Sequence, residues 1–559
     1  MANTNSITSA NNNKETSDQL QCDYLVVGAG TANLAFVDTV LSEHPDPNVN
    51  FIIVDRNSGP GGHWTTAYPF VRLHQQSCNY GVNSVSLGKT RIKKKIIGKN
   101  VVVEPFDSSD RATGEEICSY YENVVKNFVS TNRVRTFFDT EYYSADADVF
   151  VEDEGRGKEK KKQHYLKSKI SGKVYSVSCV KLVVCETNVI VPSMRKIPFP
   201  IHESVIAKPV NGLTEEIKSG KFEKYLVIGA GKTGIDAIVH LLQNNIDPDC
   251  ISWIISRDVW YIIRDKNFPT SDIDCQSGVY YKWITKSLLD PFFKADSIID
   301  YYVNMEKHGS FARLDPNLPY PKVFKGPTID TDELKMIRSI SNVVRLGRVT
   351  SITNEEVVLQ AGRIPFSSED TLVVDCMAFD FYGYHDIGRD FKIFRSNSIH
   401  LGPPTHVFNP SLTSSILGYL ESKFHDDDAK NRFCYFPYRK YDQEEDCFEY
   451  FVQSLHSQQK TMQELAKYKP AVNFILNCRT NHESPVHHGG LLKFLWALFG
   501  PTKLKRSFDR VNDVFVQKKL KGFEDQFVGR EEVDTKLLKK ALRPTTKSNI
   551  KDKKKKARK

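Results

Sequence analysis

The sequence predicts an α/β fold containing two Rossmann-like β-α-β units, because two of its stretches share one pattern. The first, DYLVVGAGTANLAF, begins at Asp23, and the second, KYLVIGAGKTGIDAIVHLLQ, begins at Lys224. In both, a short apolar run predicts a buried strand, a glycine-rich turn follows, and an amphipathic segment predicts a helix. A second apolar run completes each unit, FIIVDRN in the first and ISWIISRD in the second. This order is typical of a unit that binds a dinucleotide.

The first unit predicts a site for a dinucleotide whose adenosine carries no extra phosphate. Gly28 permits a tight turn, and Gly30 lets the backbone approach a pyrophosphate where the helix begins, at Thr31. The second strand ends at Asp55, whose carboxylate accepts hydrogen bonds from ribose hydroxyls. Asn33 replaces the third glycine of the usual fingerprint, and we expect it to displace the helix slightly without abolishing binding.

The second unit carries the complete fingerprint and predicts an NADPH site. Its turn contains Gly229, Gly231, Lys232, Thr233 and Gly234. A P-loop is excluded, because Leu226 stands where that motif requires a glycine. By residue count, Ser256 takes the position of Asp55 and Arg257 follows it. A hydroxyl and a guanidinium accept the 2′-phosphate that a carboxylate repels, and Lys232 adds a contact to this phosphate or to the pyrophosphate. The alternative is that one site has lost its ligand and only packs.

Two dinucleotide sites in one chain predict FAD in the first and NADPH in the second, since one accepts the electrons that the other supplies. After Asp55 the chain mixes glycines, aromatic rings and polar groups, as an isoalloxazine pocket requires. The residues expected at the flavin cofactor are Arg56, Gly61, Gly62, His63 and Trp64. The aromatic walls are expected from Trp64, Tyr68, Phe70 and Tyr80, with Arg72 and His74 as candidate catalytic residues. The alternative is a surface loop whose aromatic side chains pack on the core.

Four motifs carry a resemblance to a known family. GAGxxxxAF, DRxxxPGGHW, YPFVRLHQxSxxYGVNS and GAGKTGxDAxxxLL resemble an uncharacterised group of FAD/NAD(P)-dependent oxidoreductases related to flavin-containing and Baeyer–Villiger monooxygenases, over roughly residues 22 to 425. The resemblance implies that Gly61 to Trp64 lie against the flavin, that Arg72 and His74 lie near its face, and that one nucleotide-binding domain is inserted in the other.

The sequence departs from this family at two places. The monooxygenase fingerprint F-x-G-x-x-x-H-x-x-x-W is incomplete, because Phe199 and His202 stand at the wrong spacing with no glycine or tryptophan to complete it. The chain also reads VVCETN where the superfamily usually has A-T-G. The flavoprotein fold is therefore expected, while oxygen transfer stays open.

Three functions remain in competition. The leading one is an NADPH-dependent flavoprotein monooxygenase that acts with O₂ on a small organic substrate, through a C4a-peroxyflavin. The second is an NADPH oxidoreductase that passes electrons to an acceptor without oxygen transfer. The third is a non-catalytic, FAD-binding regulatory or scaffold protein that docks through a basic tail.

The expected organisation has five parts. Residues 1–20 form a disordered leader, 21–215 the first part of the FAD domain, and 216–350 the NADPH domain, whose segment from Lys266 to Ile340 is a helical lid. Residues 351–480 return to the FAD domain, and 481–559 form a C-terminal extension. The charged stretch from Glu152 predicts a hairpin or loop.

Charge is concentrated at the end of the chain. Of the net charge of +9, residues 501–559 contribute +12, from 20 Lys/Arg and 8 Asp/Glu, so the rest of the chain carries −3. The tail is expected to bind an acidic surface, nucleic acid or a nuclear import receptor, or simply to be solvated. The 11 cysteines form no metal-ligand cluster, and no apolar run of about 18 residues predicts a membrane span. We therefore expect no metal and a cytoplasmic protein, with a nuclear location as the alternative that the tail suggests.

Overall fold

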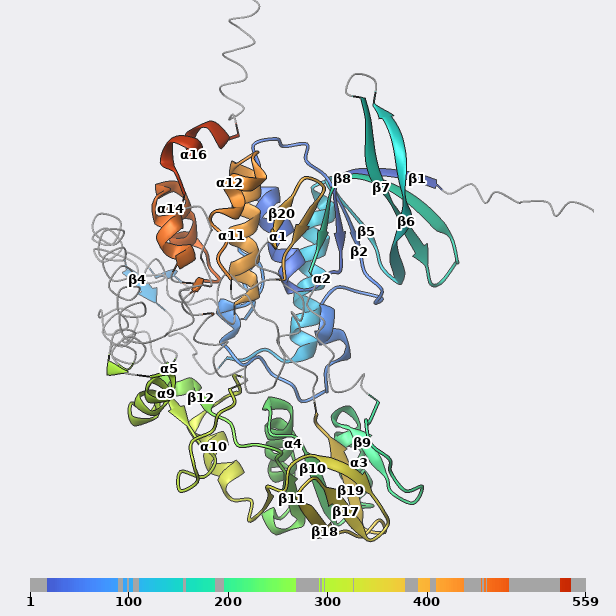
Figure 1. Ribbon diagram of the computed structural model, residues 1–559, viewed down its shortest axis with the longest axis vertical. Helices are drawn as coiled ribbons and strands as arrows, with labels where there is room; N and C mark the ends of the chain where they lie inside the picture. The colour runs from blue at the N-terminus through green and yellow to red at the C-terminus, as the bar shows by residue number, and fades with distance from the viewer. Residues whose placement is uncertain are drawn as a thin grey trace, which may run out of the picture.

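The protein has a mixed α/β fold with parallel sheets. A computed structural model describes residues 18–88, 94–97, 100–103, 110–153, 157–185, 196–267, 297–324, 326–377, 391–402, 409–436, 460–481 and 533–543, with single positions at 291, 294–295, 454 and 457–458. Figure 1 shows a first sheet in its upper half and a second in its lower half.

The first sheet is built on the first glycine-rich unit. Its strands lie in the order β20-β21-β8-β1-β2-β5. Their bounds are β1 Asp18–Val27, β2 Phe51–Val54, β5 Val134–Phe137, β8 Val174–Val184, β20 Phe394–Arg395 and β21 Ser398–His400. β1 runs parallel to both β2 and β8, and helix α1 (Thr31–Glu43) connects β1 to β2 as predicted. All four side chains of β2 are buried, which explains its unbroken apolar run.

The second sheet is built on the second unit and is entirely parallel. Its strands lie in the order β15-β11-β10-β19-β9. Their bounds are β9 Ala207–Pro209, β10 Lys224–Ile228, β11 Ile251–Ile254, β15 Asn342–Val344 and β19 Thr371–Asp375, and helix α4 (Lys232–Gln243) joins β10 to β11. The separate apolar cores around the two sheets explain why each unit is patterned as a complete β-α-β motif.

Three segments differ from the sequence-based expectation. The chain does not return to the first sheet near residue 351, because β19 pairs with β10. It returns at β20 and β21, where β21 pairs with β8 and β20 pairs with β21. An antiparallel sheet lies between β15 and β19 along the chain. It is formed by β16 (Val349–Ile352), β17 (Glu356–Leu359) and β18 (Gly362–Pro365). Residues 18–20 belong to β1 and not to a leader, while residues 1–17 lie outside the described part.

The expected lid is only partly described. Between residues 264 and 340 the chain forms α5 (Arg264–Asn267), α9 (Ile298–Lys307) and α10 (Thr331–Arg338), with short strands β12 (Tyr261–Ile263), β13 (Phe311–Ala312) and β14 (Thr328–Ile329) beside them. Residues 268–290 of this segment lie outside the described part.

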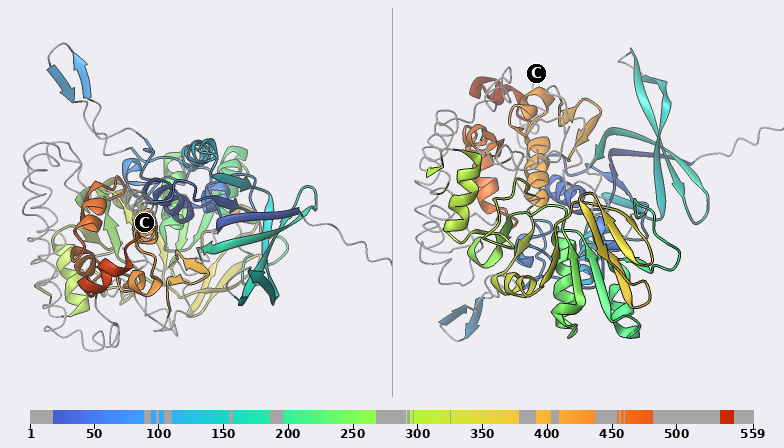
Figure 2. Two further views of the ribbon diagram at one scale, coloured as in Figure 1. Left: turned by 90° about the horizontal axis from the view of Figure 1, so that it is seen from above. Right: turned by 60° about the horizontal axis from the view of Figure 1, so that its bottom comes forward.

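A long hairpin projects from the first sheet. Strands β6 (Thr140–Asp153) and β7 (Gly157–Ser168) pair antiparallel, and β7 continues onto β8, so the predicted charged hairpin is confirmed. The hairpin stands away from the rest of the molecule in each view (Figure 1, Figure 2).

Helices from the C-terminal part of the chain cover the N-terminal unit. They are α11 (Pro410–Lys423), α12 (Asp427–Asn431), α14 (Lys469–Asn477) and α16 (Thr535–Ala541), with α2 (Gly114–Ser130) on the same unit. A Cβ on Gly418 of α11 would lie 2.9 Å from the Phe36 carbonyl oxygen of α1, so these helices pack closely. The Tyr24 hydroxyl in β1 donates to Glu421 of α11 at 2.9 Å.

Within the described residues, no helix is both long and apolar enough to cross a bilayer. The same part of the chain contains no group of three His, Cys, Asp or Glu residues able to hold a metal ion. The apolar segment from residue 489 to 500 and the basic tail from residue 544 lie outside the described residues.

Candidate functional site: two glycine turns and the groups between them

The two glycine turns occupy equivalent places in their sheets. Gly28 N–H donates to the Val54 carbonyl at 2.7 Å, and Gly229 N–H donates to the Ile254 carbonyl at 3.0 Å. Each turn therefore lies at the carboxyl end of its strand, where open α/β sheets bind ligands.

Both turns lead into helices that begin without a side-chain cap. The N-cap residues of α1 and α4 are Gly30 and Gly231, and neither makes a side-chain capping bond. Helices α3 (Leu213–Ser219) and α14 also lack a side-chain cap, whereas α2, α9, α10, α11, α12 and α16 each begin with a side chain that accepts a backbone N–H. Uncapped N–H groups at a helix N-terminus suit a pyrophosphate.

The glycines fit the close approach that such a ligand needs. Gly28 and Gly229 have φ values of +100° and +133°, where side chains are disfavoured. A Cβ on Gly62 would lie 3.0 Å from the Gly30 Cα, so two backbones meet without side chains beside the first turn. A Cβ on Gly234 would lie 2.1 Å from the Gly229 carbonyl oxygen, so α4 packs directly on its own turn. The residues present therefore fit one dinucleotide at each turn.

Asn33 has a role that the sequence did not reveal. Its Nδ2 donates to the carbonyl oxygens of Val27 and Gly28 at 2.7 and 2.8 Å, and the residue is 3% exposed. In the second unit, glycine stands at this position and the Trp253 indole donates to the equivalent Gly229 carbonyl at 2.8 Å. The carbonyl of the first glycine in each turn thus accepts a side-chain donor. The donor is Asn33 of the helix in the first unit and Trp253 of the strand in the second.

Asn33→Gly is therefore expected to destabilise the first unit. From the sequence alone, Asn33 was expected only to displace the helix slightly. The partly buried carbonyls of Val27 and Gly28 would lose their donor, at a cost of about 1–3 kcal/mol. Chemical denaturation, with Asn33→Asp as a variant that keeps the size but loses both donors, measures this cost. A free energy of unfolding unchanged in both variants would show that the amide bonds contribute nothing.

The register of the strands corrects one sequence-based equivalence. Tyr24 pairs with Phe51, and Tyr225 pairs with Ile251, so the second unit is one residue shorter between these points. Ile255, which is 1% exposed, therefore occupies the position of Asp55. The prediction that Ser256 takes this position is wrong by one residue, and Ser256 corresponds to Arg56.

The residues that follow β2 in the first unit and β11 in the second unit differ in charge. Asp55 accepts the Ala29 N–H at 2.6 Å and the Asn57 N–H at 2.8 Å, so its carboxylate also fixes the first turn. Arg257 lines a hollow of about 390 Å³ together with Lys322 and Arg345. Arg345 also pairs with Asp258 at 3.0 Å. The hollow at the end of β11 thus brings together three cations and the carboxylate of Asp258, while the position of Asp55 is taken by apolar Ile255.

The segment after β2 lies on the first turn as predicted. Gly61 N–H donates to the Ala29 carbonyl at 3.0 Å, which holds the GGHW run against the glycine turn. Trp64 Nε1 donates to the Tyr80 hydroxyl at 2.7 Å, and Tyr80 shares a short hydrogen bond with Thr31. Thr31, the first residue of α1, is therefore connected by hydrogen bonds to the aromatic side chains of this segment.

The other two predicted aromatic residues point to the second unit. The Tyr68 hydroxyl donates to Asp236 of α4 at 2.5 Å. The Phe70 ring stacks on His240 of the same helix, with centroids 3.9 Å apart. The segment from Gly61 to Phe70 thus touches both units, and Trp64 packs against both apolar cores.

The candidate catalytic residues lie between the two units. Arg72 is exposed, and its Nη1 donates to the Arg111 carbonyl at 3.0 Å. The side chains of His63 and His74 are reached by solvent but closely surrounded by protein. Loss of hydration lowers the pKa of His63 to about 4. The same cause, strengthened by nearby cations, lowers the pKa of His74 to about 3. Both imidazoles are neutral at neutral pH.

These shifted histidines predict a pH-dependent stability. Unfolded histidine has a pKa of about 6.5. Between that pH and the lower folded values, the unfolded chain binds more protons, so stability falls as the pH falls below about 6.5. Because solvent reaches both side chains and weakens these shifts, His74→Gln and His63→Gln should each flatten only a small part of the decline in melting temperature between pH 7 and 5. Thermal unfolding at a series of pH values tests this, and slopes equal to that of the unmodified protein would contradict it.

Lys232 does not face the turn as a free cation. Its side chain is 9% exposed and pairs with Asp236 and, at 3.6 Å, with Glu333 of α10. Burial alone would raise the pKa of Glu333, but Lys232, Arg264 and Arg111 lower it to about 2. Asp236 lies in the quoted motif, but sequence reasoning missed its pair with Lys232. It also missed Glu333, which comes from a segment without a motif.

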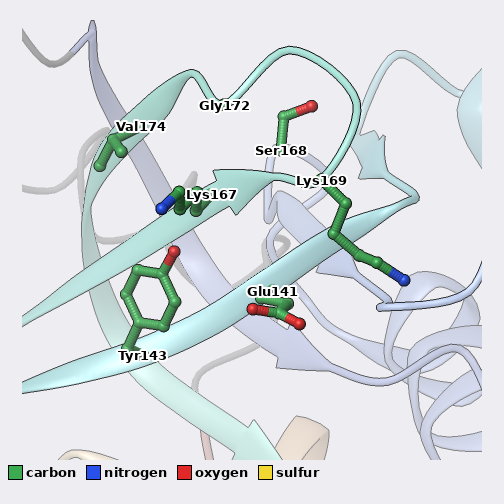
Figure 3. A pocket seen from close by; sticks show the side chains of 7 residues that line it. All are labelled: Glu141, Tyr143, Lys167, Ser168, Lys169, Gly172 and Val174. Carbon is green, nitrogen blue, oxygen red and sulfur yellow. The ribbon is translucent and has the colours of Figure 1, made fainter.

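A second hollow lies away from both turns. It has a volume of about 510 Å³ and lies at the base of the β6–β7 hairpin (Figure 3). Its lining residues are Glu141, Tyr143, Lys167, Ser168, Lys169, Gly172 and Val174. None of them is a predicted site residue, and Glu141 stands opposite Lys167 across the paired strands.

Comparison with known proteins assigns the chain to a family. No protein-family profile matches the chain. "Uncharacterized protein Rv2000" of Mycobacterium tuberculosis (strain ATCC 25618 / H37Rv) and "Uncharacterized protein Mb2023" of Mycobacterium bovis are each 32% identical over 419 residues, which span 74% of this chain and 70% of theirs. The chain therefore belongs to the same family as these mycobacterial proteins.

Solved structures with a similar fold include several monooxygenases. They include cyclohexanone monooxygenase from Rhodococcus sp. Phi1 bound to NADP⁺ (14% identity, TM-score 0.43) and an oxidized steroid monooxygenase bound to NADP (16%, 0.44). Each match covers 72% of this chain and 85% of the other. A polycyclic ketone monooxygenase from Thermothelomyces thermophila is 10% identical, with a TM-score of 0.44, over 91% of this chain and 90% of its own.

Proposed function

We propose that this protein is an FAD-containing oxidoreductase that takes electrons from NADPH and acts as a monooxygenase on a small organic substrate. The observation that carries the proposal is the pair of glycine turns, each at the carboxyl end of a parallel sheet and each leading into an uncapped helix. The GGHW segment, which bonds to the first turn and continues to the second unit, supports a shared site for two ring systems.

The first turn is proposed to hold FAD. Its binding residues are Gly28, Gly30, Thr31, Asp55, Arg56, Gly61, Gly62, His63 and Trp64. Bound FAD would accept a hydride from NADPH and pass the electrons on to O₂. The close approach of Gly30 and Gly62 keeps side chains away from a pyrophosphate, while Trp64 gives the rings an apolar wall.

The second turn is proposed to hold NADPH. Its binding residues are Gly229, Gly231, Lys232, Thr233, Gly234, Ser256 and Arg257. Lys322 and Arg345 share the hollow of Arg257, and this concentration of positive charge favours a coenzyme with a 2′-phosphate.

Arg72 and His74 are proposed to act at the reacting rings. His74 is held in place, because Arg264 Nε donates to its backbone carbonyl at 2.7 Å. A neutral imidazole can donate one hydrogen bond and accept another, so His74 would orient a polar group without adding charge.

The domain limits are proposed from the sheets. The FAD domain takes residues 21 to about 205 and resumes at about residue 391, since β21 rejoins β8. The NADPH domain takes the residues between, from β9 to β19. For the basic extension, binding to an acidic surface or an import receptor stays a prediction.

The decisive experiment measures cofactor content and the fate of the electrons. The purified protein should be yellow with bound FAD and should oxidise NADPH faster than NADH. A panel of small ketones and thioethers is then incubated with NADPH and O₂, and oxygenated product and H₂O₂ are quantified. Product in proportion to NADPH supports a monooxygenase. H₂O₂ or a reduced acceptor alone favours an oxidoreductase without oxygen transfer, and bound FAD without NADPH oxidation favours a scaffold.

A further inference from the structure

A network of charged side chains connects the second glycine turn to the segment of His74. Glu333 of α10 lies at its centre and is 8% exposed. Its Oε1 lies 3.6 Å from Lys232 Nζ and 3.4 Å from Arg111 Nη1. Its Oε2 lies 3.3 Å from Arg264 Nη2. One carboxylate therefore serves three cations.

The three cations belong to different parts of the site. Lys232 is the first residue of α4, at the turn proposed to bind NADPH. Arg111 precedes α2 of the first unit, and its carbonyl accepts a bond from Arg72. Arg264 holds the His74 carbonyl at 2.7 Å. Glu333 is thus connected to each candidate catalytic residue through one intervening arginine: to His74 through Arg264 and to Arg72 through Arg111.

Two carboxylates compete with any anion for Lys232. Asp236 lies one helical turn along α4 and pairs with Lys232 directly. Glu333 is the second carboxylate, and it stays paired with Arg111 and Arg264 if Lys232 moves away. An anionic pyrophosphate at the turn would draw Lys232 toward itself, since a doubly charged ligand offers stronger charge-assisted bonds.

We propose that Glu333 is a positioning residue that couples occupancy of the second nucleotide site to the segment of Arg72 and His74. It restrains Lys232 while the site is empty and strengthens its pairs with Arg264 and Arg111 when a dinucleotide takes Lys232. The proposal rests on the proposed function, because it requires NADP(H) at the second turn.

Glu333→Gln tests the coupling without removing the helix start. Glu333 also completes the capping box of α10 with Asp330, and glutamine suits that position. The variant loses the charge that restrains Lys232, so NADP⁺ should bind about 3- to 10-fold more tightly, which corresponds to about 0.7–1.4 kcal/mol. The absorbance change that NADP⁺ binding produces in the bound flavin should fall to half or less, because Arg264 and Arg111 no longer respond.

Asp330→Asn is the matched control. Asp330 pairs with Arg264 at 2.9 Å and lies in the same cluster, and no contact joins it to Lys232 among the ion pairs of the described residues. Asparagine caps a helix as well as aspartate does. This variant also removes one negative charge from the cluster, but it leaves the ion pairs of Lys232 in place. It should therefore change NADP⁺ affinity less than twofold and keep the flavin response. Asp236→Asn removes the other carboxylate that pairs with Lys232 and keeps an oxygen that can accept from the Tyr68 hydroxyl, so it should tighten binding but leave the flavin response intact.

The measurements are calorimetric titration of the FAD-loaded protein with NADP⁺ and difference spectra of the flavin. Equal affinities in Glu333→Gln and the unmodified protein overturn the proposal, as does equal tightening in Asp330→Asn, which would mean that only net charge counts. An unmodified protein that binds FAD but takes up no NADP⁺ overturns the proposed function itself. The two failures are therefore distinguishable.

Discussion

Gly234→Ala should destabilise the second unit by about 3 kcal/mol, the upper end of the usual cost of overpacking. The added Cβ would lie 2.1 Å from the Gly229 carbonyl oxygen, and backbone atoms on both sides leave no flexible side chain to move away. Helix α4 must then shift from its turn, so NADP⁺ binding should be lost as well. Chemical denaturation and titration with NADP⁺ measure the two effects.

Gly231→Ala is the control that separates packing from ligand approach. Nothing lies within 4 Å of a Cβ at this position, and its φ of −80° suits alanine. Stability should therefore stay unchanged, while NADP⁺ affinity falls because the methyl group lies where the pyrophosphate must approach. If Gly231→Ala bound NADP⁺ normally, the second turn would not be the pyrophosphate site.

Arg257→Ala should reduce the preference for NADPH over NADH by about 10- to 150-fold, which corresponds to one charge-assisted bond of about 1.5–3 kcal/mol. Arg257 lines the hollow at the end of β11, and Ile255 at the position of Asp55 offers no acceptor for a free 2′-hydroxyl. The expected result is a KM that rises strongly for NADPH and little for NADH.

Steady-state kinetics with both coenzymes test this prediction. Arg363→Ala is a suitable control, since Arg363 pairs with Glu356 at 2.8 Å on the antiparallel sheet and its side chain is 68% exposed. Equal kinetics of the unmodified protein with both coenzymes would remove the argument for a 2′-phosphate site.

Local patterns in the sequence were enough to predict the two β-α-β units and the hairpin. Apolar runs and glycines specify each unit within about 30 residues, so α1, α4 and the strands beside them were expected. The strand β19 was assigned to the wrong sheet, because an apolar run does not reveal which of two parallel sheets it joins. Residue counting also misplaced Ser256, since helix α4 has 12 residues where α1 has 13.

The candidate site was predicted less completely. The glycine turns lie at the carboxyl ends of their strands, and the GGHW segment bonds to the first of them, while its contact with a flavin stays a prediction. The pair of Lys232 with Glu333 was missed, because Glu333 comes from a segment without a recognisable motif and meets Lys232 only in the folded chain. The amide of Asn33 was read as a tolerated departure, since a single sequence does not show which carbonyl a side chain will satisfy.

The covering of α1 by α11 has a consequence for how the protein folds during synthesis. Tyr24 and its acceptor Glu421 are 397 residues apart along the chain. A ribosome adding about 5–20 residues per second needs roughly 20 to 80 s to span that distance. For this interval the nascent N-terminal unit exposes the apolar surface that α11 later buries, and its first sheet lacks β21. The N-terminal unit is therefore the part of the nascent chain that most needs a chaperone, and release of the C-terminal helices completes the half of the protein that was made first.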